Sequence, residues 1–304
     1  MRSAAVVGTG LIGTSIALAL RGRGVTVHLI DADPETARAA ADLGAGVVGT
    51  PREPVDLAVI AVPPRHVAAA LRQHQRDALA HDFTDVASIK ELPQREAAQA
   101  GCDLTRYVGG HPMGGREQSG PLAAHGELFH GRPWVLTPSA HTRTQAVERA
   151  RELAELCEAR PVVMAHSEHD RAVALTSHVP HLVSSLLAGR LLHGEPSQLA
   201  LAGQGLQDIT RLAAGSADLW TDILSSNAVA VADLLVGFAE DLDRVADALR
   251  KLSSADGPEQ RRVHTDRLTT ALVRGVQGRA RIPVRTPAPA PTPSRAPVAV
   301  PRGV

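Results

Sequence analysis

Short apolar runs alternate with helical patterns over the first half of the chain. Stretches rich in Val, Ile and Leu are separated by segments in which apolar residues recur every three or four positions. The predicted strands are Ala4–Val7, Val25–Ile30, Asp56–Val62, Asp85–Ala87, Val108–Gly110 and Pro133–Leu136, and the predicted helices are Leu11–Leu20, Pro34–Asp42, Arg65–Gln75 and Thr144–Ala159. This alternation predicts an α/β domain with a parallel, doubly wound sheet over residues 1–165.

The pattern changes after Met164, where Ala/Leu-rich segments replace the β-branched runs. Helical spacing of the apolar residues predicts four helices, at Val173–Leu192, Pro196–Leu212, Leu219–Leu235 and Phe238–Leu252. These helices carry more apolar surface than one thin layer can bury, so we expect residues 166–282 to be an all-α domain that makes a homodimer. The Pro/Ala-rich stretch 283–304 has few large apolar residues, which predicts a disordered tail.

Composition narrows the range of partners and compartments. The 32 basic residues are balanced by 32 acidic ones, which argues against nucleic acid as a partner. Cys102 and Cys157 provide neither a disulfide framework nor metal-ligand spacing, so we expect reduced thiols in a cytoplasmic protein. Glycines interrupt the apolar N-terminus, and no run approaches the ~20 apolar residues of a membrane span. We therefore expect neither a signal peptide nor a membrane association.

A glycine-rich turn follows the first predicted strand. The stretch Gly8-Thr9-Gly10-Leu11-Ile12-Gly13 has the spacing G-x-G-x-x-G and leads into a predicted helix. Gly8 permits a tight turn, Gly10 lets the backbone approach a pyrophosphate, and Gly13 lets the helix pack close to the strand. The amides that begin the helix, including those of Leu11 and Ile12, then face the phosphates. The turn therefore predicts a Rossmann-type dinucleotide site.

An acidic residue selects among dinucleotides. Asp31 stands at the end of the next strand, where a carboxylate binds the ribose hydroxyls and repels a 2′-phosphate. This favours NAD over NADP, although Arg38 would permit NADP if the loop brought it to the ribose. FAD is less favoured, because no second flavin motif is visible. Val62 and Pro63 end a strand in a loop that would border the nicotinamide.

Three further segments place polar residues where α/β enzymes bind substrates. Asp85-Val86-Ala87-Ser88-Ile89-Lys90 brings a hydroxyl and a cation to the carboxyl edge of the sheet. The stretch 109–120 is a glycine-rich loop that contains His111, and 203–211 ends in Arg211. Because the imidazole pKa lies near working pH, His111 suits the role of accepting a hydroxyl proton during hydride removal.

Together these segments resemble the prephenate/arogenate dehydrogenase family over roughly residues 4–252. The resemblance rests on the glycine turn, Asp85 to Lys90, Gly110-His111-Pro112-Met113-Gly114-Gly115, Ser177-His178-Val179-Pro180-His181, Gly205 to Arg211 and Asp218-Leu219-Trp220. It implies a prephenate dehydrogenase, which uses NAD to convert prephenate oxidatively into 4-hydroxyphenylpyruvate and CO2 on the route to tyrosine. Arogenate, or a 4-amino-4-deoxyprephenate of specialised metabolism, stays open as the substrate.

The resemblance also implies roles for individual residues. His111 polarises the substrate hydroxyl and Ser88 orients it, so both are assigned to catalysis. Arg211 binds a substrate carboxylate through a planar guanidinium, and Asp208, three positions earlier on a helix, orients it.

Four more residues are predicted to contact substrate. Glu117 matches an acid at the entrance of the site, and Lys90 closes the site electrostatically. His181 and Trp220 match residues that line the pocket, with Trp220 contributed by the second subunit.

Three alternatives weigh against this interpretation. His166, His169, His178 and His181 form two H-x-x-H pairs, but Asp170 is the one Cys or carboxylate at matching spacing and Pro180 distorts the second pair, so no metal is predicted. A β-hydroxyacid dehydrogenase or imine reductase would need a catalytic Lys or Asp in the helical domain, and Lys251 lies too near its end. A non-catalytic NAD-sensing protein is expected to lack Ser88, His111 or Arg211, and all three are present.

Overall fold

The structure is a computed structural model in which residues 1–114 and 120–283 are described. The chain divides into two compact units, Met1–Leu242 and Asp243–Val304. The first unit includes the sheet and also most of the predicted helical domain, because the helix that begins at His166 packs on the sheet. The predicted boundary at residue 165 therefore lies inside the first unit. Most of the predicted tail, from Val284 onward, lies outside the described residues.

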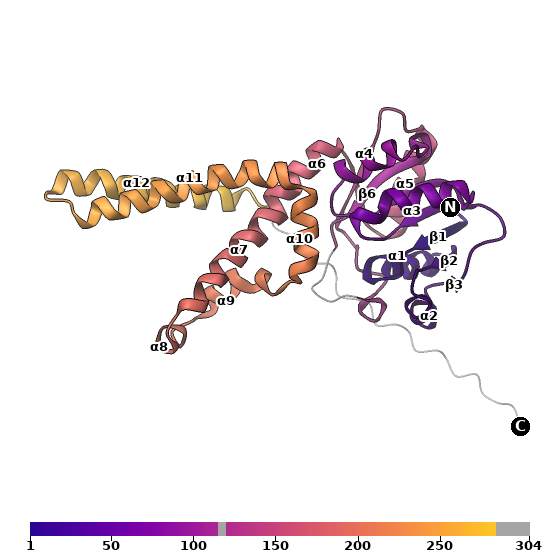
Figure 1. Cartoon of the computed structure of the whole chain (residues 1–304), viewed down its shortest axis with the longest axis horizontal. Helices are drawn as coiled ribbons and strands as arrows, with labels where there is room; N and C mark the ends of the chain where they lie inside the picture. Colours follow the sequence, from indigo (N-terminus) through magenta and orange to yellow (C-terminus); the bar gives the residue numbers. More distant parts are fainter. Residues whose placement is uncertain (115–119, 284–304) are drawn as a thin grey trace, which may run out of the picture. The chain divides into compact units, whose positions relative to one another are not determined.

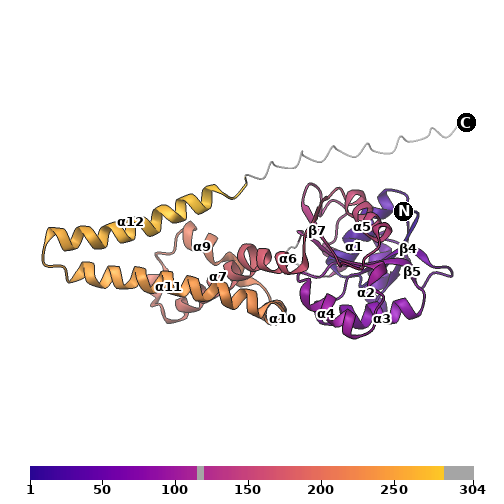
Figure 2. The ribbon, with the colours of Figure 1, turned by 90° about the horizontal axis from the view of Figure 1, so that it is seen from above.

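An eight-stranded sheet forms the centre of the first unit (Figures 1 and 2). The strands are β1 (Ser3–Val7), β2 (Thr26–Ile30), β3 (Val47–Val48), β4 (Val55–Ile60), β5 (Ala80–Asp85), β6 (Tyr107–Pro112), β7 (Pro133–Pro138) and β8 (Arg160–Val163). Their order is β3-β2-β1-β4-β5-β6-β7-β8, and all neighbours are parallel except β6 and β7. The predicted Rossmann-type class is confirmed, with one antiparallel pair that the sequence did not predict.

Helices cover both faces of this sheet. They are α1 (Leu11–Gly22), α2 (Pro34–Asp42), α3 (Val67–Arg76), α4 (Glu91–Gln99) and α5 (Thr144–Leu156), with a 3₁₀ turn, η1 (Pro64–His66), before α3. Side chains of a strand alternate between faces, so Ala4 and Val6 pack with α1 and α5, whereas Ala5 and Val7 pack with α3 and α4. The sheet is therefore buried on both faces.

The predicted strand Asp85–Ala87 is wrong in its position along the chain. β5 instead covers Ala80–Asp85, and the segment after it is irregular. Its sequence, Ala-His-Asp-Phe-Thr-Asp, is too polar to be recognised as a buried central strand. Asp82 is nevertheless buried, because Arg143 reaches its carboxylate at 2.8 Å. The short edge strands β3 and β8 and helix α4 were also not predicted.

The helical part of the first unit begins directly after β8. It contains α6 (His166–Val173), a π-helical turn η4 (Ala174–His178), α7 (Val179–Arg190), a 3₁₀ turn η5 (Leu191–His193), α8 (Pro196–Leu199), α9 (Gln204–Thr210), a 3₁₀ turn η6 (Arg211–Ala214), α10 (Ala217–Ser226) and the start of α11 (Ala228–Ser253). The predicted helix Pro196–Leu212 is thus divided. So is Leu219–Leu235, because α10 and α11 meet at Asn227 with a bend of 94°. At this bend the Asn227 side chain makes hydrogen bonds to residues outside α10 and α11.

One helical run in the described part of the chain meets the length and apolarity of a membrane span. It covers His166–His193, and 28% of its apolar window is buried. By composition alone an apolar helix that packs against protein meets the same criterion.

The second unit contains the end of α11 and helix α12 (Pro258–Ala280). Within it, Lys251 pairs with Asp247 one helical turn away at 2.9 Å. No separate helix was predicted at α12, because its face carries many charged residues and few large apolar ones.

Candidate active site

The glycine turn between β1 and α1 has no room for side chains at two positions. Gly8 has φ +96°, and a Cβ added there would lie 2.4 Å from the Ala61 carbonyl oxygen. A Cβ at Gly13 would lie 1.9 Å from the Gly8 carbonyl oxygen. By contrast, the space around Gly10 is open, and no side chain caps the start of α1 there. The turn therefore leaves helical amides accessible to an anionic group.

Asp31 lies beside this turn at the end of β2. Its carboxylate accepts hydrogen bonds from the Thr9 amide at 2.6 Å and the Thr9 hydroxyl at 2.8 Å. Val62 is half-buried and lies near Gly8, while Pro63 is exposed. An open glycine, uncapped helical amides and an adjacent carboxylate fit the phosphates and ribose of a dinucleotide. Gly8 to Gly13, Asp31 and Val62 are the residues that would hold it.

His111 lies near the carboxyl end of β6 and contacts a histidine from α6. Its Nδ1 is 2.8 Å from Nε2 of His169, and the two rings meet edge to face. Burial, followed by the nearby His169 and Lys90, lowers the pKa of His111 well below its usual value. The imidazole is therefore neutral at ordinary pH, as a proton acceptor must be.

Asp170 continues this chain of hydrogen bonds. Its Oδ1 lies 2.8 Å from Nδ1 of His169 and accepts the Lys90 amide at 2.8 Å, and Oδ2 accepts the Glu91 amide at 2.9 Å. Burial would raise the pKa of the Asp170 carboxyl, but the hydrogen bonds from His169, Glu91 and Lys90 lower it overall. Asp170 belongs to α6, and its buried carboxylate is thus held against the amides that begin α4.

Lys90 is enclosed by protein groups. Its Nζ donates to the Asp85 carboxylate and, at 2.5 Å, to the Gly110 carbonyl oxygen, and the side chain is 0% exposed. Tyr107 donates its hydroxyl to the same carboxylate at 2.5 Å. Burial lowers the pKa of Lys90, against the effect of Asp85. The Lys90 ammonium, which was predicted to contact substrate, instead contacts protein groups in the structure.

Ser88 and His111 belong to neighbouring parallel strands: Ser88 comes after β5, and His111 lies within β6. Ser88 is half-buried in the bend after β5, and His111 lies near the end of β6, so both belong to the same edge of the sheet. Gly110 permits this approach, because a Cβ there would lie 2.5 Å from the Asp85 carbonyl oxygen. The structure therefore brings the two residues predicted for catalysis to one edge.

His181 and Trp220 form a stacked pair within one chain. Their ring centroids are 3.5 Å apart and their planes differ by 12°. Gly215 packs against both rings, because a Cβ there would lie 2.7 Å from the indole Nε1 of Trp220. His178 meets Trp220 edge to face at 6.2 Å. The contribution of Trp220 to the site of a second subunit stays a prediction.

The predicted carboxylate-binding residues lie on the surface of the helical part. Arg211 is exposed at the junction of α9 and η6. Asp208 is also exposed and accepts a hydrogen bond from Gln204 at 2.8 Å. Glu117 lies outside the described residues.

Three buried residues that are connected to His111 through His169 were not predicted as parts of the site: His169 itself, Asp170, and Asn227, which binds Asp170. Asn227 donates to the Asp170 carbonyl oxygen at 2.8 Å and to Nδ1 of His178 at 3.1 Å. Burial lowers the pKa of His178 to about 4. The H-x-x-H spacing did indicate His169, but as a metal ligand. No group of three or more His, Cys, Asp or Glu that could hold a metal occurs in residues 1–114 and 120–283.

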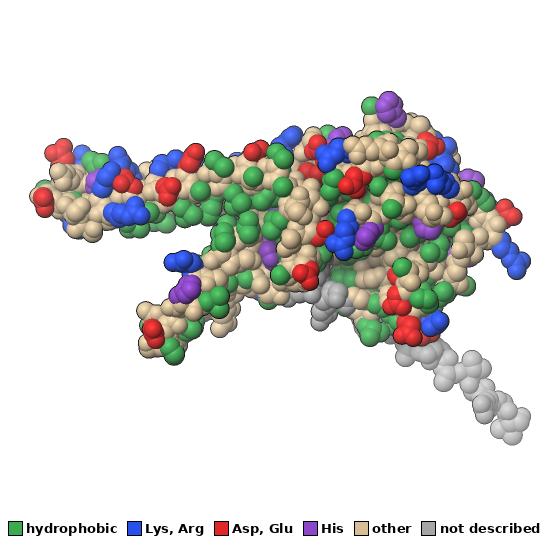
Figure 3. Space-filling view, viewed as in Figure 1, with side chains coloured by type: hydrophobic (Ala, Val, Ile, Leu, Met, Phe, Trp, Pro, Cys, Tyr) green, Lys and Arg blue, Asp and Glu red, His purple; other side chains and the backbone are tan. Residues whose placement is uncertain are grey.

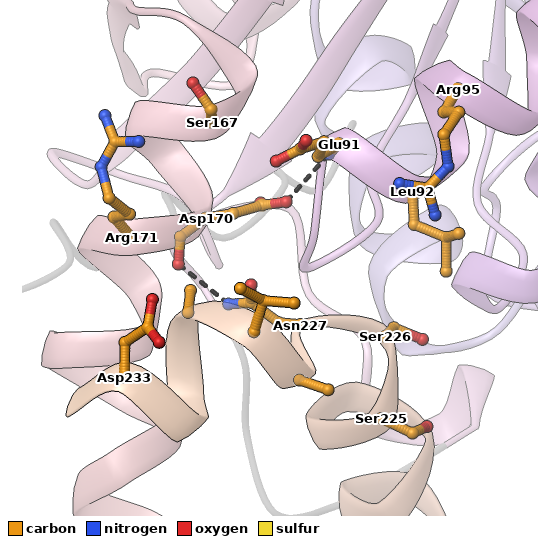
Figure 4. A pocket seen from close by; sticks show the side chains of 13 residues that line it. Glu91, Leu92, Arg95, Ser167, Asp170, Arg171, Ser225, Ser226, Asn227 and Asp233 are labelled. Atoms are coloured by element: carbon orange, nitrogen blue, oxygen red, sulfur yellow. Dashed lines mark hydrogen bonds between the residues drawn. The ribbon is translucent and has the colours of Figure 1, made fainter. Parts of the chain in front are cut away.

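A cavity of about 390 Å³ is lined in part by Asp170 (Figure 4). It lies among α4, α6 and the bend between α10 and α11, and Figure 4 shows Asp170 and Asn227 on its wall. Arg95 and Arg171 line it together with Glu91 and Asp233. Its mixed charges do not indicate one ligand.

A dinucleotide turn and a neutral, half-buried imidazole at one edge of a doubly wound sheet define an oxidoreductase of the nucleotide-dependent type. The chain belongs to the prephenate dehydrogenase family. The family's nucleotide-binding domain matches residues 16–163, and its dimerization domain matches residues 165–263. The resemblance that the motifs indicated is therefore confirmed.

Several relatives share most of the chain. It is 44% identical over 286 residues to the probable prephenate dehydrogenase NovF of Streptomyces niveus, covering 94% of this chain and 78% of that protein. It is 34% identical to the cyclohexadienyl dehydrogenase of Zymomonas mobilis, covering 83% and 89%. The solved arogenate dehydrogenase of Synechocystis has a TM-score of 0.72 at 25% identity, covering 91% and 99%.

Proposed function

We propose that this protein is a prephenate dehydrogenase, with His111 as the group that accepts the substrate hydroxyl proton. The observation that supports this most is the position of a neutral, half-buried imidazole at the same sheet edge as Ser88, on a sheet that also carries the dinucleotide turn. The relatives named for prephenate and cyclohexadienyl substrates support the same reaction.

The cofactor in this proposal is NAD. The Asp31 carboxylate favours ribose hydroxyls over a 2′-phosphate, and the family's nucleotide-binding domain accounts for the fold around it. When bound, NAD accepts the hydride from C4 of the substrate.

His111 takes and returns one proton. It accepts the C4 hydroxyl proton while hydride leaves, which produces a dienone. The C–C bond to the ring carboxylate then breaks, CO2 departs, and the electron pair aromatises the ring and generates a phenolate oxygen. His111 returns its proton to that oxygen, so the reaction consumes and releases no net proton. The loss of CO2 and the gain of aromaticity make the step irreversible.

Substrate binding needs cations at the carboxylates. Arg211 is the proposed partner, since guanidinium binds carboxylate in a bidentate manner. Asp208, Glu117, His181 and Trp220 remain proposed pocket residues. Lys90 has a structural role in this proposal, because its ammonium is bound to Asp85 and Gly110.

The proposed enzyme is a homodimer. Large apolar side chains are exposed on the helices of the family's dimerization domain, including Leu186 and Val236 at 61% each and Val229 at 78%. Figure 3 shows hydrophobic side chains gathered along α11. Exposed apolar surface of this extent is typical of a protein interface. A cytoplasmic location remains part of this proposal.

Prephenate is proposed as the substrate, with arogenate as the second candidate because of the Synechocystis relative. The 4-amino-4-deoxy analogue of prephenate stays a third candidate substrate, on the sequence prediction alone. Purified protein with NAD should be incubated with each of the three compounds while NADH absorbance is followed. Turnover with prephenate is expected, and no turnover with any of the three would refute the enzyme.

The role of His111 is tested by substitution. His111→Asn should lower kcat about 10²- to 10⁴-fold, because the proton acceptor is lost, and should leave the Kd for NAD nearly unchanged. His141→Asn is a matched control, since His141 is exposed in the turn before α5. Equal losses of rate and NAD affinity in His111→Asn would contradict the assignment.

A further inference from the structure

We propose that His169 and Asp170 are positioning residues that hold His111 in the tautomer whose Nε2 is free to accept the substrate proton. This inference rests on the proposed function of His111. It assigns a task to two buried groups on α6, which are only 1% and 3% exposed.

The direction of each hydrogen bond follows from the carboxylate. Ionised Asp170 is only an acceptor, so Nδ1 of His169 must donate to it across 2.8 Å. In the form of His169 with its single ring proton on Nδ1, the lone pair is on Nε2. His111 must therefore donate from its Nδ1 across 2.8 Å. The Nε2 of His111 is left with a lone pair, which is the atom a general base needs.

Asp170 is fixed through both its carboxylate and its backbone carbonyl. The amides of Lys90 and Glu91, at the start of α4, donate to the two carboxylate oxygens. At the bend between α10 and α11, Asn227 donates to the backbone carbonyl of Asp170 and to His178. The pair is therefore held by α4, α6 and the bend, while His111 belongs to the sheet. An orienting group this constrained keeps the ring of His111 in one position.

The pair also has an electrostatic effect during the reaction. When His111 accepts a proton it becomes a buried cation, and the neighbouring Lys90 ammonium disfavours that charge. The Asp170 carboxylate, connected through His169, offsets it. Lys90 is itself paired with Asp85, which reduces its repulsion of His111. The remaining titratable neighbour, His178, is neutral, because burial lowers its pKa to about 4.

Two substitutions at His169 separate positioning from packing. His169→Leu fills similar space but cannot accept a hydrogen bond from His111, so kcat should fall on the order of 10²-fold. The KM for substrate and for NAD should change little, because neither contact depends on the tautomer. His169→Gln keeps an oxygen for His111 and an amide for Asp170, and should recover at least about tenfold of the lost rate.

Glu168→Gln is the matched control, since Glu168 is an exposed carboxylate on the same helix. It should retain the wild-type kcat. The proposal would be overturned if His169→Leu kept kcat within about twofold of wild type, or if His169→Gln were as slow as His169→Leu while both remained folded by circular dichroism.

A measurement on the unmodified protein covers the case in which these variants fail to fold. Nitrogen-15 NMR of histidine-labelled wild-type protein reports which ring nitrogen of His111 is protonated, with the resonance assigned through the His111→Asn variant. A proton on Nδ1 is expected, and a proton on Nε2 would contradict the inference. The spectrum needs no turnover, so absence of activity with every substrate would refute the proposed function without deciding the tautomer.

Discussion

Replacement of Lys90 by Met tests whether this lysine stabilises the fold or binds substrate. The Lys90 and Asp85 side chains are both 0% exposed, so the substitution leaves a buried carboxylate without its cation. Removal of one partner of a buried pair costs about 3–5 kcal/mol. Asp85 keeps the Tyr107 hydroxyl at 2.5 Å and the Ala87 amide at 2.7 Å, so we expect the lower end, about 3 kcal/mol.

The assay is equilibrium urea denaturation at one fixed protein concentration, because dimerisation makes stability depend on concentration. The matched control is Lys251→Met, at the chain's other lysine, which is 53% exposed and pairs with Asp247. This surface pair should contribute less than about 1 kcal/mol. The double variant Asp85→Asn with Lys90→Met removes both charges and should recover about half of the loss.

The two interpretations of Lys90 differ in kinetics as well as in stability. A structural lysine predicts lower stability with nearly unchanged KM in the fraction that stays folded. If Lys90→Met unfolded within about 1 kcal/mol of wild type and its KM for substrate rose tenfold or more, the reasoning would be refuted and a substrate contact would be supported.

Three further predictions concern the turn, the cofactor and pH. Gly13→Ala should prevent correct packing of α1 and give little soluble protein, because a Cβ at Gly13 would meet backbone at 1.9 Å. Gly10→Ala should fold normally, because the space at Gly10 is open, and should bind NAD more weakly by titration calorimetry. Asp31→Ser should raise KM for NAD and increase the ratio of NADP to NAD activity; an unchanged ratio would argue against a ribose contact. Because burial lowers the pKa of His178 to about 4, the unfolded chain binds this proton first, so stability should fall as pH drops from about 6.5 to 4, by a few kcal/mol at most. Urea midpoints of wild type and His178→Gln over this range check it, and parallel curves would exclude His178 as the cause.

Local patterns were sufficient to predict the dinucleotide turn. Gly8, Gly13 and Asp31 lie within one strand–helix–strand unit, so their spacing in the sequence carries the geometry. β5 was missed because its buried Asp82 and Asp85 depend on Arg143 and Lys90, whose contacts no hydropathy pattern reveals.

The residues around His111 could be predicted only in part. Ser88 follows β5 and His111 lies near the end of the neighbouring strand β6, which a strand pattern can indicate. His169 comes from α6, which lies far along the chain, and its carboxylate partner is fixed by amides of α4, a helix that was not predicted. Lys90 was given a substrate role because its position in a motif is visible in the sequence, whereas its burial is not.

The stoichiometry of products from prephenate tests the central claim most directly. Purified wild-type protein should be supplied with NAD and prephenate labelled with carbon-13 at the ring carboxylate, and NADH and labelled CO2 should be measured in the same sample. The account predicts equimolar amounts of the two products, and the loss of both in His111→Asn. Formation of NADH without CO2, or full turnover in His111→Asn, would contradict it.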